Sequence, residues 1–208
     1  MAKAPVRRRT QAERREETRA RILTAAVNEL KKNSYGGFRV DKVAVAAKVS
    51  RGAQTHHFPT KESLALAALE TIYQDSAAAS LSLISRLRAK DDVLGMLLED
   101  TSQFFLGHNF AISMSMLNSG EQEQALRKKV RAMSRKYRFP IEKAWLEALT
   151  RSGLAEEHAR TILNLTQSIY RGMMVRKFLV NDPAYIRFTI AQWSKIARAY
   201  VDLNTDPI

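Results

Sequence analysis

The chain contains no cysteine and only four histidines among its 208 residues. Disulfides, thiolate zinc sites and cysteine nucleophiles are therefore excluded, and a reducing compartment is favoured. No apolar run approaches the roughly 18 residues that a membrane-spanning helix requires. Charged residues, rather than an apolar segment, follow the basic residues 1–10, so we expect no signal peptide. These absences predict a soluble, cytoplasmic protein that does not enter a membrane.

Acidic residues are scarce as well, with 21 Asp and Glu against 34 Lys and Arg, so the formal net charge is +13. The excess is uneven, because residues 1–65 hold 15 basic and 6 acidic side chains and the remainder holds 19 and 15. A surface of this kind suits a polyanion, either nucleic acid or an anionic membrane face. We therefore expect the polyanion to bind near the N-terminus.

Proline is rare in the interior, where only Pro59, Pro140 and Pro183 occur. Between them, apolar residues recur at a spacing near 3.6, and no run alternates as a strand does, which predicts an all-α fold. We expect a kink at Pro140. The expected helices cover about residues 14–32, 40–47, 51–58, 61 into the seventies, 91–105, 108–118, 121–150, 154–180 and 184–203.

The stretch "SRGAQTHHFPTK" (residues 50–61) follows a short apolar-faced helix predicted over residues 40–47. Ser50 is a good N-cap for a second short helix, which must end before Pro59. Two short helices joined by a tight turn form a helix-turn-helix, whose second helix fits the major groove of DNA. The spacing by itself is moderately specific, because short helix pairs also occur in bundles.

The line "RVDKVAVAAKVSRGAQTHHFPTKESLALAAL" closely resembles the DNA-binding domain of the tetracycline-repressor (TetR) family of bacterial transcription regulators. The strong match covers roughly residues 15–70. The residues that carry it are Val49, Ser50, Gly52, His57, Phe58, Lys61 and Leu64. The polar, basic composition of residues 1–13 predicts a flexible arm. The resemblance implies a three-helix helix-turn-helix domain over 14–70 and a larger helical ligand-binding and dimerisation domain over 71–208.

By this resemblance, Arg51, Gly52, Thr55 and His56 face the major groove. Lys61 reaches a phosphate from the start of the next helix, where backbone N–H groups also favour anions. Further candidates for contact with the duplex are Arg39, Lys42, Lys48 and Ser50. The arginines of residues 7–9 either enter a minor groove or remain solvated.

Four residues depart from the usual family pattern. Thr55 replaces a tyrosine, and Arg39 replaces an N-cap threonine. Gln54 replaces an apolar residue, so we expect it either to read a base or to lie at the protein surface. Lys48 replaces the turn glycine, which implies either strain at a positive φ or a slightly different turn.

The adjacent histidines His56 and His57 point about 100° apart on a helix, so they cannot chelate one ion as an i, i+4 pair does. We therefore expect no metal site, a DNA contact for His56 and a packing role for His57.

The last two predicted helices carry wide apolar faces. Their stripes comprise Ile162, Leu165, Ile169, Gly172 and Met173, and Ile186, Ile190, Trp193, Ala197 and Tyr200. The resemblance implies that these helices pair with those of a second copy, and the homodimer then reads a palindromic operator. The alternative is an ordinary core within one chain.

The middle helices are rich in aromatic residues and methionine, which suits an apolar pocket for an unidentified small-molecule effector. The candidate lining residues are Phe104, Phe105, His108, Phe110, Met114, Met116, Trp145, Tyr170, Met173 and Met174. Such a set at helical spacing is more often part of a hydrophobic core than of a pocket.

Enzyme motifs such as HExxH, GxSxG and a glycine-rich phosphate loop are absent, so we expect no catalytic residues and no cofactor. The leading hypothesis is a sequence-specific DNA-binding transcriptional regulator, expected to be a repressor that an effector releases from DNA. The alternative is a charge-driven protein that binds any duplex or anionic surface.

Overall fold

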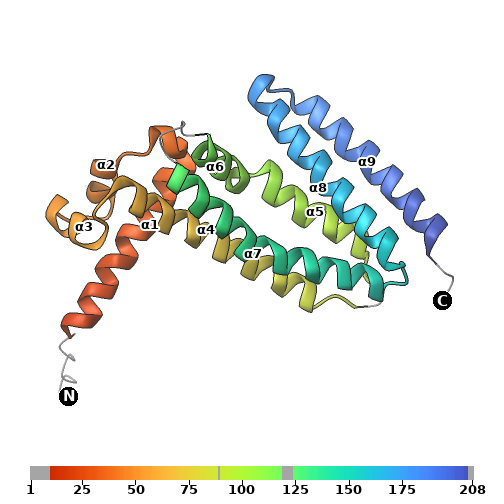
Figure 1. Ribbon diagram of the computed structural model, residues 1–208, viewed down its shortest axis with the longest axis horizontal. Coiled ribbons are helices and arrows are strands. Elements are labelled where there is room, and N and C mark those ends of the chain that lie inside the picture. The colour runs from red at the N-terminus through yellow and green to blue at the C-terminus, as the bar shows by residue number, and fades with distance from the viewer. Residues whose placement is uncertain (1–9, 89, 119–123, 206–208) are drawn as a thin grey trace, which may run out of the picture. The chain divides into compact units, whose positions relative to one another are not determined.

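The computed structural model describes residues 10–88, 90–118 and 124–205 (Figure 1). Within these ranges all named elements are helices, and an isolated bridge pairs Leu154 with Thr205. The predicted all-α fold is confirmed. Most of the predicted basic arm, including the arginines of residues 7–9, lies outside the described residues.

The helices follow one another along the chain with short connections. They are α1 (Gln11–Gly37), α2 (Val40–Ala46), α3 (Arg51–His57), α4 (Lys61–Ser85), α5 (Val93–Leu106), α6 (His108–Leu117), α7 (Gln124–Arg151), α8 (Glu156–Leu179) and α9 (Pro183–Asn204). Helix α7 continues through Pro140 as one element. None of the described helices is long and apolar enough to cross a membrane.

Two compact units divide the chain, with the boundary between Thr71 and Ile72 inside α4. In the N-terminal unit, α1 begins three residues earlier than the expected Arg14. The reason is a capping box: the Glu13 backbone N–H donates to Thr10 Oγ1 (3.2 Å), and the Thr10 N–H donates to the Glu13 carboxylate (2.8 Å). These bonds satisfy two helix-end donors and start the helix at Gln11.

The N-terminal core lies where α1, α2, α3 and the start of α4 meet. Helix α1 leaves helical geometry at Ser34, where φ is 51°, and the chain turns towards α2. The fully or nearly fully buried apolar side chains are Ile22, Ala26, Leu30, Phe38, Val43, Ala44, Ala47, Phe58, Leu64, Ala65 and Ala68. This small core holds α3 in place through Phe58.

In the C-terminal unit, α5 packs against α6 and α8, and α7 packs against α6 and α8 (Figure 1). Two buried tryptophans join neighbouring helices by hydrogen bonds from the indole N–H. Trp145 on α7 donates to the Asp100 carboxylate on α5 (2.8 Å), and Trp193 on α9 donates to Thr166 Oγ1 on α8 (3.1 Å). The Asp92 carboxylate caps α5 through the Gly95 N–H (2.9 Å) and pairs with Arg198 on α9.

Candidate nucleic-acid interface

A four-residue turn, residues 47–50, joins α2 to α3. Lys48 has a φ of 54°, so of the two expected outcomes the structure adopts the strained, left-handed one. The Val49 N–H donates to the Ala44 carbonyl (3.1 Å), and Ser50 Oγ accepts from the Ala53 N–H (3.1 Å). Ser50 is thus the N-cap that the sequence predicts, and its side chain starts α3.

The inner face of α3 is held by Gln54 and Phe58. Gln54 is 1% exposed, and its Nε2 donates to the Phe58 carbonyl oxygen (3.1 Å), which closes the end of the helix. The expectation that Gln54 reads a base or lies at the surface is therefore wrong for this structure. A buried amide tied to the helix end cannot reach a base edge, and Gln54 leaves the set of DNA-contact candidates.

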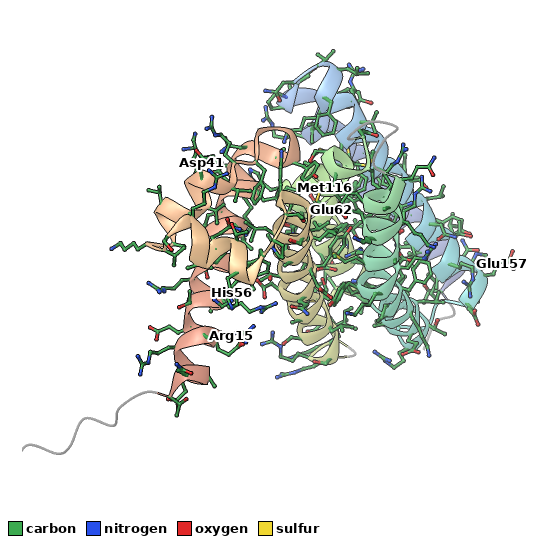
Figure 2. The ribbon with its side chains drawn as sticks, turned by 60° about the vertical axis from the view of Figure 1, so that its left-hand side comes forward. Arg15, Asp41, His56, Glu62, Met116 and Glu157 are labelled. Carbon is green, nitrogen blue, oxygen red and sulfur yellow. The ribbon has the colours of Figure 1, made fainter. Side chains whose placement is uncertain are left out.

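The outer face of α3 presents Arg51, Gly52, Thr55 and His56, all of them exposed. Thr55 Oγ1 donates to the Arg51 carbonyl (2.9 Å), so this hydroxyl is already engaged within the helix. Figure 2 labels His56, whose ring projects from α3. Four candidates that the sequence placed in the major groove therefore share one solvent-facing side of a short, capped helix.

Basic side chains flank α3 on the neighbouring elements. Lys42 on α2 and Lys48 in the turn line a groove of about 610 Å³ against α1. Arg21 and Lys32 of α1 line the same groove, together with Glu17 and Glu29. The helical pattern of α1 revealed only its apolar face, so the sequence did not associate these two cations with the turn.

Arg39 is exposed but engaged. Its Nε and Nη2 lie 3.2 and 3.0 Å from the two carboxylate oxygens of Asp41. This hydrogen bond lowers the pKa of the Asp41 carboxyl and raises the pKa of Arg39. Arg39 would have to exchange this partner to contact a phosphate.

Helix α4 begins with a second pair of reciprocal bonds, between Thr60 and Ser63. Lys61, the first residue of the helix, is exposed, and its Nζ lies 4.9 Å from the centroid of the buried Tyr35 ring. This contact holds the ammonium group near the N-terminus of α4, where the helix dipole also favours an anion.

His57 differs from its neighbour in being half-buried, and its ring meets that of His56 edge to face with centroids 5.6 Å apart. Burial lowers the pKa of His57, and the nearby positive charges of His56, Arg15 and Arg19 lower it further. The neutral ring is therefore the form that the folded unit favours. Arg19 also lies over the Phe58 ring, 5.4 Å from its centroid.

The effector candidates do not all gather in one place. Seven of the ten are buried in the C-terminal unit, namely Phe104, Phe105, Met116, Trp145, Tyr170, Met173 and Met174, and Phe110 is half-buried. Met114 is half-buried, whereas His108 is exposed at the first position of α6, so the structure removes it from the buried set. Helix periodicity could not show this difference, because it carries no information on which end of an element is covered.

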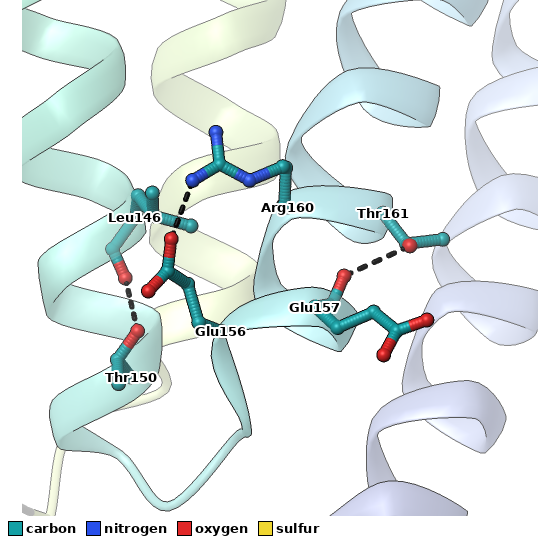
Figure 3. A network of polar contacts seen from close by, with 6 residues as sticks. All are labelled: Leu146, Thr150, Glu156, Glu157, Arg160 and Thr161. Atoms are coloured by element: carbon teal, nitrogen blue, oxygen red, sulfur yellow. Dashed lines mark hydrogen bonds and ion pairs between the residues drawn. The ribbon is translucent and has the colours of Figure 1, made fainter.

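A groove of about 790 Å³ runs between α7 and α8, and none of those ten candidates lines it. Its walls include Leu146, Thr150, Glu156 and Arg160 (Figure 3). Thr150 Oγ1 donates to the Leu146 carbonyl (2.8 Å), and Glu156 pairs with Arg160. A third bond, from Thr161 Oγ1 to the Glu157 carbonyl (2.9 Å), also stays within one helix, so these contacts do not tie α7 to α8.

Arg138 is a buried residue that the sequence analysis missed. It is 6% exposed, and its guanidinium carbon lies 4.0 Å from the centroid of the Phe104 ring. Arg138 ends a run of seven basic residues without an acidic one, from Arg127 onwards. A run of this kind normally marks a solvated helix face, so no signal in the sequence singled out the one member that points inwards.

The dimerisation candidates differ in burial. Ile162, Trp193 and Ala197 are buried within the chain, and the Tyr200 hydroxyl lies 2.7 Å from His158 Nδ1. Ile162, Trp193 and Ala197 are enclosed by the chain itself, which corrects the expectation that they meet a second copy, whereas Tyr200 is half-buried. Leu165 and Gly172 are exposed, whereas Ile169, Ile186 and Ile190 are half-buried.

Other apolar side chains on the last two helices are open to solvent. They comprise Val175, Phe178, Leu179, Phe188, Ile196 and Leu203. The sequence stripes therefore mix buried and exposed positions, because a helix that packs within its own chain and also exposes apolar residues has two apolar faces.

Comparison with known proteins supports the assignment of α2 and α3 as a helix-turn-helix of a transcription regulator. The profile of the bacterial regulatory proteins of the tetR family matches residues 22–68. The HTH-type transcriptional regulator CymR of Pseudomonas putida is 39% identical over 176 residues, which cover 85% of this chain and 87% of that protein.

Solved structures share the fold at lower identity. A TetR-family transcriptional regulator from Cytophaga hutchinsonii has a TM-score of 0.68 at 12% identity and covers 97% of this chain and 100% of its own. The multidrug binding protein EbrR complexed with proflavin has a TM-score of 0.54 at 18% identity, with 88% and 99% covered. At identities this low, the similarity shows a shared fold and does not extend to a shared ligand or role.

Proposed function

The chain belongs to the tetR family of bacterial regulatory proteins, and on this basis we propose that it is a repressor that binds a palindromic operator as a homodimer and is released by a small organic effector. It is a DNA-binding transcriptional regulator with a helix-turn-helix unit followed by a larger helical unit. The proposal concerns which residues contact DNA, how two copies associate and what ends repression.

One observation supports the DNA contact above all others: α3 has a buried side and an exposed side of different chemistry. Gln54 and Phe58 anchor the buried side, whereas Arg51, Thr55 and His56 lie open to solvent. An arginine and a histidine on a short helix offer donors to the acceptors that guanine and adenine present in the major groove. Helix α3 is therefore the recognition helix in this proposal.

Phosphate contacts come from the residues around α3. Lys42 on α2, Lys48 in the turn and Lys61 at the start of α4 are exposed. Ser50 and Arg39 lie at the starts of α3 and α2. Each lysine that neutralises a phosphate releases counterions and makes binding weaker as salt increases. These contacts position the protein, whereas Arg51 and His56 discriminate between sequences.

Two copies associate through the exposed apolar residues of α8 and α9 in this proposal. Phe178 is 62% exposed and Phe188 is 64% exposed. Apolar side chains of this size on adjacent helices mark an interaction surface, and a twofold dimer buries the same patch on each copy. The two recognition helices then meet successive half-sites of a palindrome.

The effector releases the protein from its operator if it binds more tightly to a conformation that fits DNA poorly. EbrR, which shares this fold, is complexed with proflavin, so a helical unit of this type accommodates an organic ligand. A coupling of about 1–3 kcal/mol changes DNA affinity on the order of 5–150-fold.

Fluorescence anisotropy on duplexes tiled from the DNA that flanks the gene tests the proposal. At near-physiological salt with excess random competitor, we expect binding to be confined to a palindromic tile. Arg51→Ala combined with Lys61→Ala should abolish it, and Lys195→Ala, which removes an exposed lysine from α9, serves as the control. Equal, salt-sensitive binding to every tile would instead support the charge-driven alternative.

A further inference from the structure

The positive charge beyond residue 65 is concentrated on one stretch of α7. Residues 124–141 hold seven basic side chains and no acidic one, whereas the rest of residues 66–208 holds 12 basic and 15 acidic side chains. The next turns of the same helix mix both signs, and Lys143 pairs there with Glu147. A surface that needs charge only for solubility intersperses the two signs. The single-sign stretch of α7 therefore has a different requirement.

Three of these cations form an exposed row on α7. Lys128, Arg131 and Arg135 occupy positions i, i+3 and i+7, which share one face of a helix, and all three are exposed. This cationic row spans about 10 Å along the helix axis. It lines an open hollow of about 680 Å³, whose other described walls also belong to α7, namely Gln124, Ala125 and Arg127.

The fold does not compensate the cationic row. Within the described ranges, no ion pair joins Lys128, Arg131 or Arg135 to a carboxylate. Like charges three or four residues apart destabilise a helix. The apolar packing of this stretch comes from other positions, since Leu126 and Val130 are buried. Packing thus gives no reason for the three charges, whereas an external anion would remove their mutual repulsion.

The shape of the cationic row favours duplex DNA as that anion. A duplex carries one negative charge for about every 1.7 Å of its axis, so a row of this length meets several phosphates at once. An anionic membrane matches less well, because interfacial helices insert bulky apolar side chains. The small residues Ala125 and Ala132 are exposed beside the row, and the exposed Phe139 lines the separate groove with α8.

We propose that the cationic row is a second DNA-binding surface, which holds the phosphates of a duplex without reading their sequence. This goes beyond the proposed function, which assigns operator recognition to α3 and the residues around it. Lysine and arginine contacts to phosphates carry no sequence information directly. A protein with this surface retains a duplex that lacks its operator, and when bound to its operator it holds further DNA through α7.

Anisotropy with a random-sequence duplex and no competitor tests the surface in the full-length protein. The parent carries Arg51→Ala and Lys61→Ala, which remove two proposed contacts of the helix-turn-helix unit. Adding Lys128→Gln, Arg131→Gln and Arg135→Gln should lower the slope of log affinity against log salt by about three for each subunit in contact. The ratio of parent to variant affinity should then increase at least about 40-fold as salt is lowered from about 200 to 50 mM.

A matched control removes three charges from elsewhere in the C-terminal unit. Arg86→Gln, Arg88→Gln and Lys90→Gln change exposed residues between α4 and α5, and together they lower the net charge equally. We expect the control to keep the slope of the parent. An equal decrease in the control would mean that net charge alone is responsible, and an unchanged slope in the α7 variant would mean that the row does not meet DNA. Either result overturns the proposal.

Two further measurements separate the DNA role from other roles of the row. The α7 glutamine variant should melt at or above the temperature of its parent, because it relieves repulsion between like charges. A melting temperature below that of the control would show that the cations support the fold, and would overturn the proposal. Vesicles of phosphatidylserine and phosphatidylcholine should bind parent and variant equally. A variant that loses vesicle binding but keeps duplex binding would assign the row to a membrane instead.

Operator recognition is measured separately, in proteins that retain Arg51 and Lys61. The preference for the operator tile over random duplexes should survive the three glutamine substitutions, because in the proposed function it comes from α3. Absence of this preference in the wild type would contradict the repressor proposal and leave the comparison on α7 standing. An unchanged salt slope would contradict only the second surface.

Discussion

The side-chain amide of Gln54 donates to the carbonyl oxygen of Phe58 across 3.1 Å, and both side chains are buried. The bond joins residues one turn apart and closes the last turn of α3. It also turns Gln54 away from the exposed side of the helix, where Arg51 and His56 lie. In the proposed recognition helix, Gln54 therefore closes the C-terminal end of the helix, whereas Arg51 and His56 remain available to contact DNA.

Gln54→Leu should therefore leave operator affinity within about twofold, because the side chain does not reach DNA. Arg51→Ala, its comparison on the outer face, should weaken binding by about 1–3 kcal/mol. Anisotropy on the operator duplex measures both. A loss in Gln54→Leu as large as that in Arg51→Ala would mean that Gln54 leaves the core when DNA binds.

Lys48 offers a test of backbone strain that is separable from charge. Its φ of 54° is costly for a residue with a Cβ but not for glycine. Lys48→Gly should thus unfold with a free energy about 1 kcal/mol higher than Lys48→Ala. Chemical denaturation gives this difference.

The same two variants lose the same charge, so their operator affinities should fall equally. The slope of log affinity against log salt should decrease by about one for each subunit, and so by about two for the dimer, in each variant. Equal stability of the two variants would contradict the strained turn, and unchanged affinity in both would remove Lys48 from the phosphate contacts.

His57 should make the N-terminal unit less stable in acid. Its pKa in the folded state is lowered from 6.5, chiefly by burial, so the unfolded chain binds a proton more readily. Its contribution to stability is fully present above pH 6.5 and is lost as the pH falls below that value through the lowered pKa. Thermal melts between about pH 7 and pH 5 should show a decrease that His57→Gln reduces. His108→Gln, an exposed histidine in the other unit, should retain the full decrease.

Phe188 should be needed for association of two copies. It is 64% exposed on α9, so Phe188→Asp should cost little within the chain but place a charge in the proposed interface. Sedimentation should show a monomer, whereas Phe188→Leu should remain a dimer. A dimer that survives Phe188→Asp would locate the interface elsewhere.

Sequence patterns determined the helical fold and the recognition element of this protein, because both depend on local chemistry. Spacing near 3.6 residues marks a helix wherever one face is buried, and Ser50 and Pro59 define the ends of α3 through bonds that neighbouring residues make. The residues on the exposed side of α3 were inferred from the resemblance to the tetR family. The start of α1 at Gln11 also depends on neighbouring residues, since Thr10 and Glu13 form its capping box, but the apolar spacing begins only further along the helix.

Only the tertiary structure decided which side chains are enclosed. Gln54, Arg138, Trp193 and Ala197 lie on helices whose pattern the sequence revealed, but each side chain is covered by another helix of the chain. Burial depends on contacts between residues far apart in sequence, and periodicity within one helix carries no information about them. For the same reason, seven successive cations on α7 looked alike in the sequence, and packing against the phenylalanines of α5 selected Arg138 as the one that is buried.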